Sequence, residues 1–122
     1  SEDEYRLRER KSLLNSKDIS VLEHPVWRDT QTAVSSTQRL LKIAKETGRK
    51  IHVLHISTSD EISILEKFKN ISTCEVTPQH LFFHSPKCYN DLGTLVQMNP
   101  PIRDKNHNIG LWEGVKKKTR KC

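Results

Sequence analysis

The sequence lacks any apolar run that approaches about 18 residues, the length a membrane-spanning helix needs. It also lacks a Cys-x-x-Cys pair. The three cysteines, Cys74, Cys88 and Cys122, are widely spaced, so we expect reduced thiols and neither a zinc knuckle nor a disulfide framework. No P-loop, dinucleotide fingerprint or Ser-His-Asp arrangement is present. Because an acidic, polar segment stands where a signal peptide would, these absences favour a cytoplasmic protein.

Apolar residues are also scarce. They make up 34% of the 122 residues, whereas charged residues make up 30%. This length suits one domain or a piece of one, and it is about half of the roughly 250 residues of a (β/α)₈ barrel. We therefore do not expect a fully self-sufficient core.

The net charge of +6 arises at the end of the chain. Five of the 21 basic residues lie in the last seven positions, and the remaining 16 face 15 acidic residues. No aromatic pattern, helix-turn-helix or zinc-finger signature accompanies them, so a solvated tail is favoured over a nucleic-acid-binding arm. We divide the chain into one domain over residues 1–117 and a basic tail over residues 118–122.

Predicted helices and short strands alternate along the chain. A short exposed helix is expected within 1–14, and apolar residues at three- and four-residue spacing predict a helix over 27–47 that Gly48 ends. A strand over 50–56 follows. Thr58 and Glu61 then form a capping-box pattern at the start of the next helix. A second strand over 72–76, an irregular segment over 79–103 and a helix over 104–118 complete an α/β succession that implies a parallel sheet.

His55 is the candidate functional histidine, because it ends the first predicted strand just before a loop that leads into a helix. His52 lies three residues earlier. Side chains alternate along a strand, so the two histidines face opposite sides and cannot ligate one metal. We expect His52 to pack among the covering helices. On these residues alone, His55 is either a metal ligand or a core histidine.

Polar residues near the other predicted loops have weaker interpretations. Glu75, near the end of the second strand, is a catalytic carboxylate or, more simply, half of an ion pair at the rim. His80 and His84 follow on a loop, where surface histidines are common. Asn99 precedes two prolines that stiffen its loop, and with Arg103 it suits recognition of a small ligand carrying a carboxylate. A turn-forming Asn before Pro remains the alternative.

Three linked motifs, at residues 52–58, 74–81 and 92–103, resemble dihydroorotase, a cyclic amidohydrolase of the amidohydrolase superfamily. Residues 2–4 and 24–29 are similar to the same family's fifth barrel strand loop and the helix after it. The resemblance implies a partial (β/α)₈ TIM barrel, running from the end of strand five to the helix before strand eight. It also implies a zinc-dependent hydrolase acting on cyclic amide C–N bonds, which closes N-carbamoyl-L-aspartate to L-dihydroorotate in pyrimidine biosynthesis.

The resemblance assigns roles to two residues of this chain. His55 matches a metal-ligand histidine at the end of strand six, and Asn99 matches a substrate-binding asparagine. The family's His-x-His, its bridging lysine or aspartate, its strand-five histidine and its general-base aspartate have no counterpart here. We therefore expect no catalytic residue, and we expect that zinc is not retained by this chain alone.

Three hypotheses follow from this pattern. The favoured one is a dihydroorotase fragment that is inactive alone. A second is half of a split enzyme that needs a complementing barrel half or a homo-oligomer. A third is a non-catalytic binding remnant, with nucleic acid bound through the lysine tail as its least favoured form.

Overall fold

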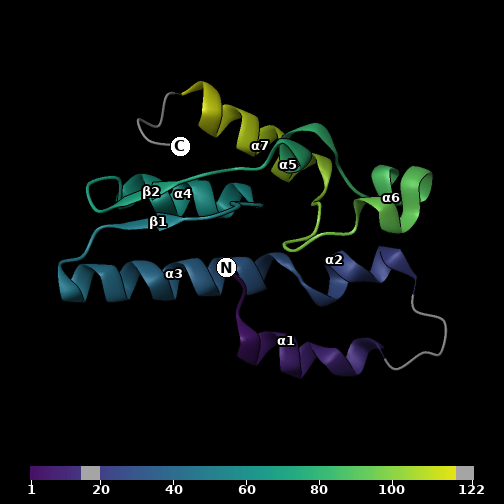
Figure 1. Cartoon of the computed structure of the whole chain (residues 1–122), viewed down its shortest axis with the longest axis horizontal. Helices are drawn as coiled ribbons and strands as arrows, with labels where there is room; N and C mark the ends of the chain where they lie inside the picture. Colours follow the sequence, from purple (N-terminus) through teal and green to yellow (C-terminus); the bar gives the residue numbers. More distant parts are fainter. Residues whose placement is uncertain (15–19, 118–122) are drawn as a thin grey trace.

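The computed structural model describes residues 1–14 and 20–117, in which seven α-helices, three short 3₁₀ helices and two strands follow one another (Figure 1). The predicted basic tail at 118–122 lies outside the described residues. The order is α1 (Glu4–Arg10), η1 (Lys11–Leu14), η2 (Val21–Glu23), α2 (His24–Trp27), α3 (Thr30–Thr47), β1 (Ile51–Val53), α4 (Ser59–Lys67), β2 (Ser72–Cys74), α5 (Pro78–Phe82), α6 (Lys87–Leu92), η3 (Gly93–Val96) and α7 (Lys105–Lys116).

The two strands form a parallel pair in which His52 lies opposite Thr73. Parallel pairing joined by a helix agrees with the expected α/β succession. Both strands are shorter than expected. The chain turns away after Val53, although the Ile56 amide still donates to the Glu75 carbonyl at 2.8 Å. The turn therefore separates His55 from the strand that was expected to carry it.

The helix predicted over 27–47 is confirmed from Thr30 onward as α3, whereas Trp27 belongs to the separate helix α2. Asp29 caps the start of α3 by accepting from the Thr32 amide, and Gly48 ends it in the left-handed conformation at φ 64°. Along the expected stripe, Leu41 is fully buried, whereas Leu40 remains 38% exposed. The helix thus turns one face to the core and leaves a partly apolar edge outside.

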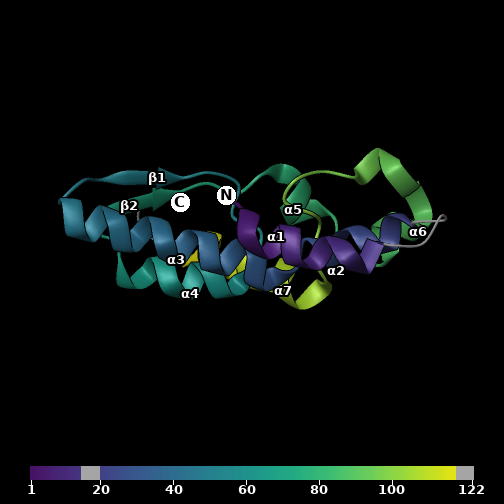
Figure 2. The same cartoon turned by 90° about the horizontal axis from the view of Figure 1, so that it is seen from below.

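The core lies between the sheet and helices α3, α4 and α7. Figure 2 shows the strands along one side of the molecule and α4 and α7 along the opposite side. The buried cluster draws one or more residues from each of these elements: Leu41, Val53, Ile56, Leu65, Cys74 and Leu111. The other face of the sheet carries the exposed His52 and Glu75 and the 52% exposed Leu54. One sheet face is therefore covered and the other is open among the described residues.

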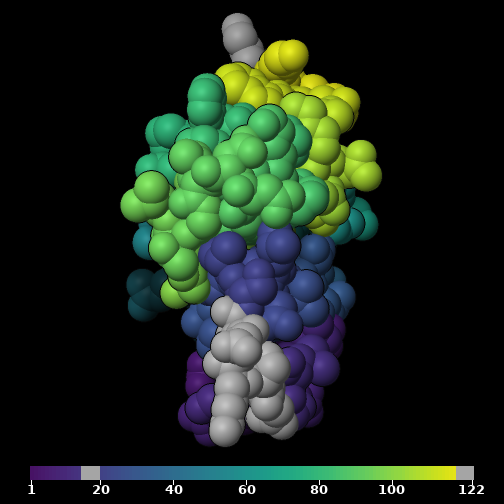
Figure 3. Space-filling view, turned by 90° about the vertical axis from the view of Figure 1, so that its right-hand side faces the viewer, coloured from purple at the N-terminus to yellow at the C-terminus, as the bar shows by residue number. Residues whose placement is uncertain are grey.

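The segment 79–103 is more ordered than expected. It holds α6, η3 and all of α5 except Pro78, and Thr77 caps α5 by accepting from the His80 amide. Its buried residues Cys88, Tyr89 and Ile102 form a second cluster. The space-filling view shows α6 lying beside the segment that holds α2 (Figure 3). Prolines limited the length of the helices here without preventing them.

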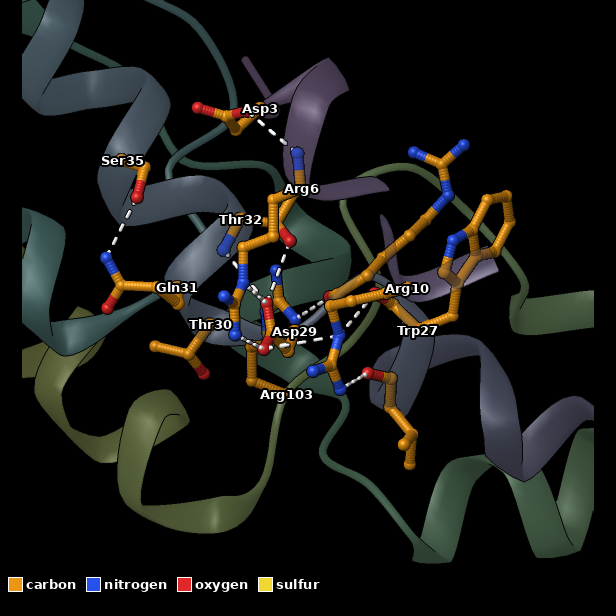
Figure 4. A network of polar contacts seen from close by, with 12 residues as sticks. Asp3, Arg6, Arg10, Trp27, Asp29, Thr30, Gln31, Thr32, Ser35 and Arg103 are labelled. Carbon is orange, nitrogen blue, oxygen red and sulfur yellow. Dashed lines mark hydrogen bonds and ion pairs between the residues drawn. The ribbon is translucent and has the colours of Figure 1, made fainter. Parts of the chain in front are cut away.

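A polar network joins α1 to the start of α3 (Figure 4). Arg6 binds Asp29 through Nε at 2.9 Å and Nη2 at 2.5 Å, and Arg10 reaches the same carboxylate at 3.4 Å. Arg10 also donates to the carbonyls of Val26 and Trp27. Burial of Asp29 acts to raise its pKa, but the hydrogen bonds from Arg6 and Thr32 outweigh burial and hold that pKa well below its usual range.

Two remaining expectations concern cysteines and membranes. Cys88 is a free, buried thiol as expected, but the expectation of reduced thiols is wrong for Cys74, which is disulfide-bonded. Within residues 1–14 and 20–117, no helix is both long and apolar enough to cross a bilayer.

Candidate functional site

His55 lies two residues beyond the end of β1 in a left-handed conformation, with φ at 44°. Among the described residues it is the only non-glycine residue with positive φ. Such a conformation costs roughly 1–2 kcal/mol for a residue with a Cβ. His55 presents a buried imidazole nitrogen, Nδ1, that makes no hydrogen bond within the described part of the chain.

The residues that follow His55 are held by the buried carboxylate of Glu61. One carboxylate oxygen accepts from the Ser57 and Thr58 amides, each at 3.2 Å, and from the Thr58 hydroxyl at 3.0 Å. The other accepts from the Thr37 hydroxyl of α3 at 2.7 Å. The predicted capping box is thus confirmed. The additional bond to α3 joins residues 24 positions apart, and local sequence spacing gave no sign of it.

His52 lies on the open face of the sheet, so the expectation that it packs among the covering helices is wrong. Its Nδ1 lies 2.6 Å from the Thr73 hydroxyl and its Nε2 lies 3.3 Å from the Glu75 carboxylate. Glu75 thus pairs with His52, which agrees with the simpler of its two interpretations, half of an ion pair at the rim. The error arose because β1 ends before His55, so strand alternation does not extend from one histidine to the other. The two histidines nevertheless have separate surroundings.

His80 is buried, contrary to the expectation of a surface loop histidine. It lies in α5 and is 2% exposed. Its Nδ1 lies 2.7 Å from the Thr77 hydroxyl and its Nε2 lies 3.1 Å from the Pro100 carbonyl. Burial lowers the pKa of His80 to about 4, and the nearby charges of Arg103 and His55 act in the same direction. A neutral imidazole therefore donates from Nε2 to Pro100 and accepts at Nδ1 from Thr77.

Asn99 keeps an exposed side chain at the start of a firmly held segment. The two prolines after it are fully buried, and the bond between Asn99 and Pro100 is cis. Since His80 binds the Pro100 carbonyl, the residue beside Asn99 is tied to α5. The amide of Asn99 is therefore accessible from a fixed backbone, which is suitable for binding a polar group.

Arg103 does not accompany Asn99 as an exposed carboxylate-binding group. It is 5% exposed, its Nη1 donates to the Arg28 carbonyl, and its Nε lies 3.4 Å from the Ser57 hydroxyl. Its Nη2 is buried without a partner among the described residues. Burial lowers the pKa of Arg103, and the charges of Glu61 and Glu2 oppose that shift. Arg103 therefore joins segments of this chain to one another.

A cavity of about 350 Å³ lies between α2, α6 and the start of α7. Arg103, Tyr89 and His107 contribute to its wall, but His55 and Asn99 do not. The two candidate residues predicted from sequence are thus outside this cavity. Of the two, Asn99 is tied to the interior through His80, whose Nε2 lies 3.1 Å from the carbonyl of the next residue, Pro100.

The described residues do not fit a catalytic zinc by themselves. Within 1–14 and 20–117, no group of three or more histidine, cysteine, aspartate or glutamate side chains is arranged to hold a metal ion. Catalytic zinc sites use about three protein ligands and leave one position open. The unpartnered Nδ1 of His55 is of the right chemical type, but one such nitrogen is insufficient.

No family model matches this chain. Among curated relatives, a dihydroorotase of Aquifex aeolicus is 39% identical over 83 residues, which are 66% of this chain and 19% of the relative. An allantoinase of Salmonella paratyphi B is 34% identical over 98 residues, 78% of this chain and 21% of the relative. The chain thus spans about a fifth of the length of these relatives.

Solved hydantoinases have the same fold over nearly all of this chain. An L-hydantoinase (dihydropyrimidinase) from Arthrobacter aurescens superposes with a TM-score of 0.90 at 23% identity, over 98% of this chain and 27% of that one. A D-hydantoinase from a Thermus species gives 0.83 at 21% identity, over 97% and 27%. The fold is therefore that of part of a TIM-barrel amidohydrolase. The sequence relatives, named dihydroorotase and allantoinase, support the amidohydrolase superfamily, and the hydantoinases show the fold alone.

Proposed function

We propose that this chain contributes part of the barrel of a dihydroorotase, which interconverts N-carbamoyl-L-aspartate and L-dihydroorotate in pyrimidine biosynthesis. The proposal includes zinc dependence and a cytoplasmic location. The observation that carries it is the unpartnered, buried Nδ1 of His55, two residues beyond the end of β1. The 39% identity to a dihydroorotase and the three linked motifs support this reaction over others of the superfamily.

In this proposal His55 is one zinc ligand and Asn99 is a substrate contact. The side-chain amide of Asn99 offers donors and an acceptor to a carbonyl, carboxylate or N–H group of the substrate. Zinc, when bound, would supply Lewis acidity and an activated water. The proposed segment runs from the end of barrel strand five to the helix before strand eight, within a domain over residues 1–117.

The chain alone is proposed to be inactive and to hold no zinc. Its described donors do not form a three-ligand site. The remaining ligands and the general base would come from outside residues 1–14 and 20–117. A complementing barrel half is the proposed partner. The sheet has only two strands, β1 and β2, so each strand has one unpaired edge among the described residues, and one sheet face is open. A homo-oligomer is the alternative source.

Substrate turnover tests this proposal. The chain is purified alone and after co-expression with the neighbouring reading frames of its own genome, and L-dihydroorotate, allantoin and hydantoin are offered to each sample. We expect hydrolysis of dihydroorotate by the co-expressed complex and none by the chain alone. The Asn99→Ala complex should lose activity while retaining assembly. Preference for allantoin would replace dihydroorotase with the activity of the second group of relatives, and absence of turnover from every complex would refute the enzymatic role.

A further inference from the structure

The backbone on both sides of His55 is fixed by bonds from other elements. Before it, the Val53 carbonyl accepts from the Glu75 amide at 3.1 Å, and after it the Ile56 amide donates to the Glu75 carbonyl at 2.8 Å. Ile56 is also 1% exposed within the core cluster. These anchors leave only residues 54 and 55 to complete the turn. A strained residue persists when its surroundings over-determine its conformation.

A second set of anchors begins at Ser57. Its amide donates to the Glu61 carboxylate at 3.2 Å, and its hydroxyl lies 3.4 Å from Nε of Arg103. Arg103 and Glu61 are both at least nine-tenths buried. Ser57 therefore contacts a buried guanidinium through its hydroxyl and a buried carboxylate through its amide.

Arg103 also belongs to the segment that carries Asn99. Only Pro100, Pro101 and Ile102 separate them, and all three are buried. The same guanidinium donates to the carbonyl of Arg28 between α2 and α3. One side chain thus joins the loop after β1, the Asn99 segment and the start of α3.

We propose that Arg103, Ser57 and Glu61 form a positioning unit that keeps His55 in its left-handed conformation and fixes it relative to Asn99. Arg103 acts as a fork whose Nε and Nη1 bind two different segments, and a lysine cannot reproduce that geometry. Glu61 holds the loop from the helix side. The inference rests on the proposed roles of His55 and Asn99, but the conformational statement can be tested without either metal or substrate.

The test is NMR spectroscopy of the full chain with assigned His55 resonances. The ¹³Cα and ¹³Cβ shifts of His55 report whether its φ is positive. In Arg103→Lys we expect His55 to lose this signature or to show a second set of signals. The matched control, Arg49→Lys, changes an exposed arginine beside β1 and should leave the His55 signals unchanged.

A second variant covers the case in which Arg103→Lys fails to fold. Ser57→Ala removes the hydroxyl that Arg103 contacts but leaves the bond to the Arg28 carbonyl and the backbone bond to Glu61. We expect a second His55 signal set here too. Unchanged His55 shifts in a folded Arg103→Lys or Ser57→Ala chain would overturn the proposal. A failed turnover or zinc assay would count against the proposed function and leave this result standing.

Discussion

At the scale of single residues, His80 illustrates how tertiary structure changes the chemistry of a side chain. Its sequence position, just after Pro78 and before a proline-rich segment, indicated an exposed loop. Thr77 instead caps a short helix that carries His80 into the interior, where both ring nitrogens are bonded. The helix cap can be read from the neighbouring residues Thr77 and Pro78. The contact between His80 and Pro100 joins residues 20 positions apart, so local sequence does not indicate it.

The lowered pKa of His80 predicts a stability that depends on pH. Since the folded pKa is about 4 and the unfolded value is 6.5, the unfolded chain binds more protons between these limits. The free energy of unfolding should therefore fall as pH decreases from about 6.5 towards 4, by on the order of 3 kcal/mol in full. Urea unfolding at several pH values measures this. His80→Gln should remove much of the slope in this window, and an unchanged slope would contradict the assignment.

At the scale of elements, α3 shows which features local sequence determines. Its apolar spacing and its end at Gly48 were apparent from residues near one another, whereas Asp29 and Thr30 were equally possible caps until the structure showed Asp29. The ion pairs from α1 to Asp29 were not apparent, because Arg6 is 23 positions away. The strands were expected too long. The predicted ranges ran to residues 56 and 76, whereas the strands end at Val53 and Cys74, and the left-handed turn at His55 interrupts the first of them.

Asp29 should contribute through its charge as well as its cap. Asn caps helices about as well as Asp, so Asp29→Asn isolates the loss of the ion pairs with Arg6 and Arg10. We expect a loss of about 1–2 kcal/mol of unfolding free energy for Asp29→Asn, and more for Asp29→Ala. Urea denaturation gives both values. Asp91→Asn, in an exposed pair with Lys87, is the control and should be neutral. Equal effects of Asp29→Asn and Asp91→Asn would contradict this account.

Glycines allow α7 to approach α4 closely. A Cβ on Gly110 would lie 2.4 Å from the Cβ of Ser59, and one on Gly114 would lie 3.2 Å from atoms of the Ile62 side chain. Gly110→Ala should destabilise the chain by about 1–3 kcal/mol despite the better helix propensity of alanine. Gly114→Ala should cost less, because a flexible side chain can adjust. Thermal unfolding of both variants tests the order, and the reverse order would refute the packing.

At the scale of the whole molecule, the partial-barrel fold could be inferred from the helix and strand succession together with the three linked motifs. The TM-score of 0.90 against a hydantoinase confirms the TIM-barrel type of fold, and the exact barrel segment remains a prediction. In the candidate site, His55 and Asn99 are the residues proposed from sequence, and their roles stay predictions. The connecting residues Glu61, His80 and Arg103 were assigned other roles or none, because their contacts join distant segments.

An isolated chain with one open sheet face should be only marginally stable. Leu54 is 52% exposed on or beside that face, and each strand has one unpaired edge among the described residues. Apolar residues make up only 34% of the sequence. Calorimetry of the monomer should therefore give a broad transition at low temperature. A sharp, cooperative transition at high temperature would contradict this prediction, because it would show that the open sheet face hardly lowers the stability of the chain.

The central claim is that His55 is one ligand of a zinc site completed outside the described residues. Zinc content, measured on the chain purified alone and on its co-expressed complex, tests this most directly, with His55→Ala beside His52→Ala as the matched control. The account predicts no zinc on the chain alone, zinc in the complex, loss of that zinc in His55→Ala and retention in His52→Ala. Zinc bound equally by the His55→Ala complex would contradict it.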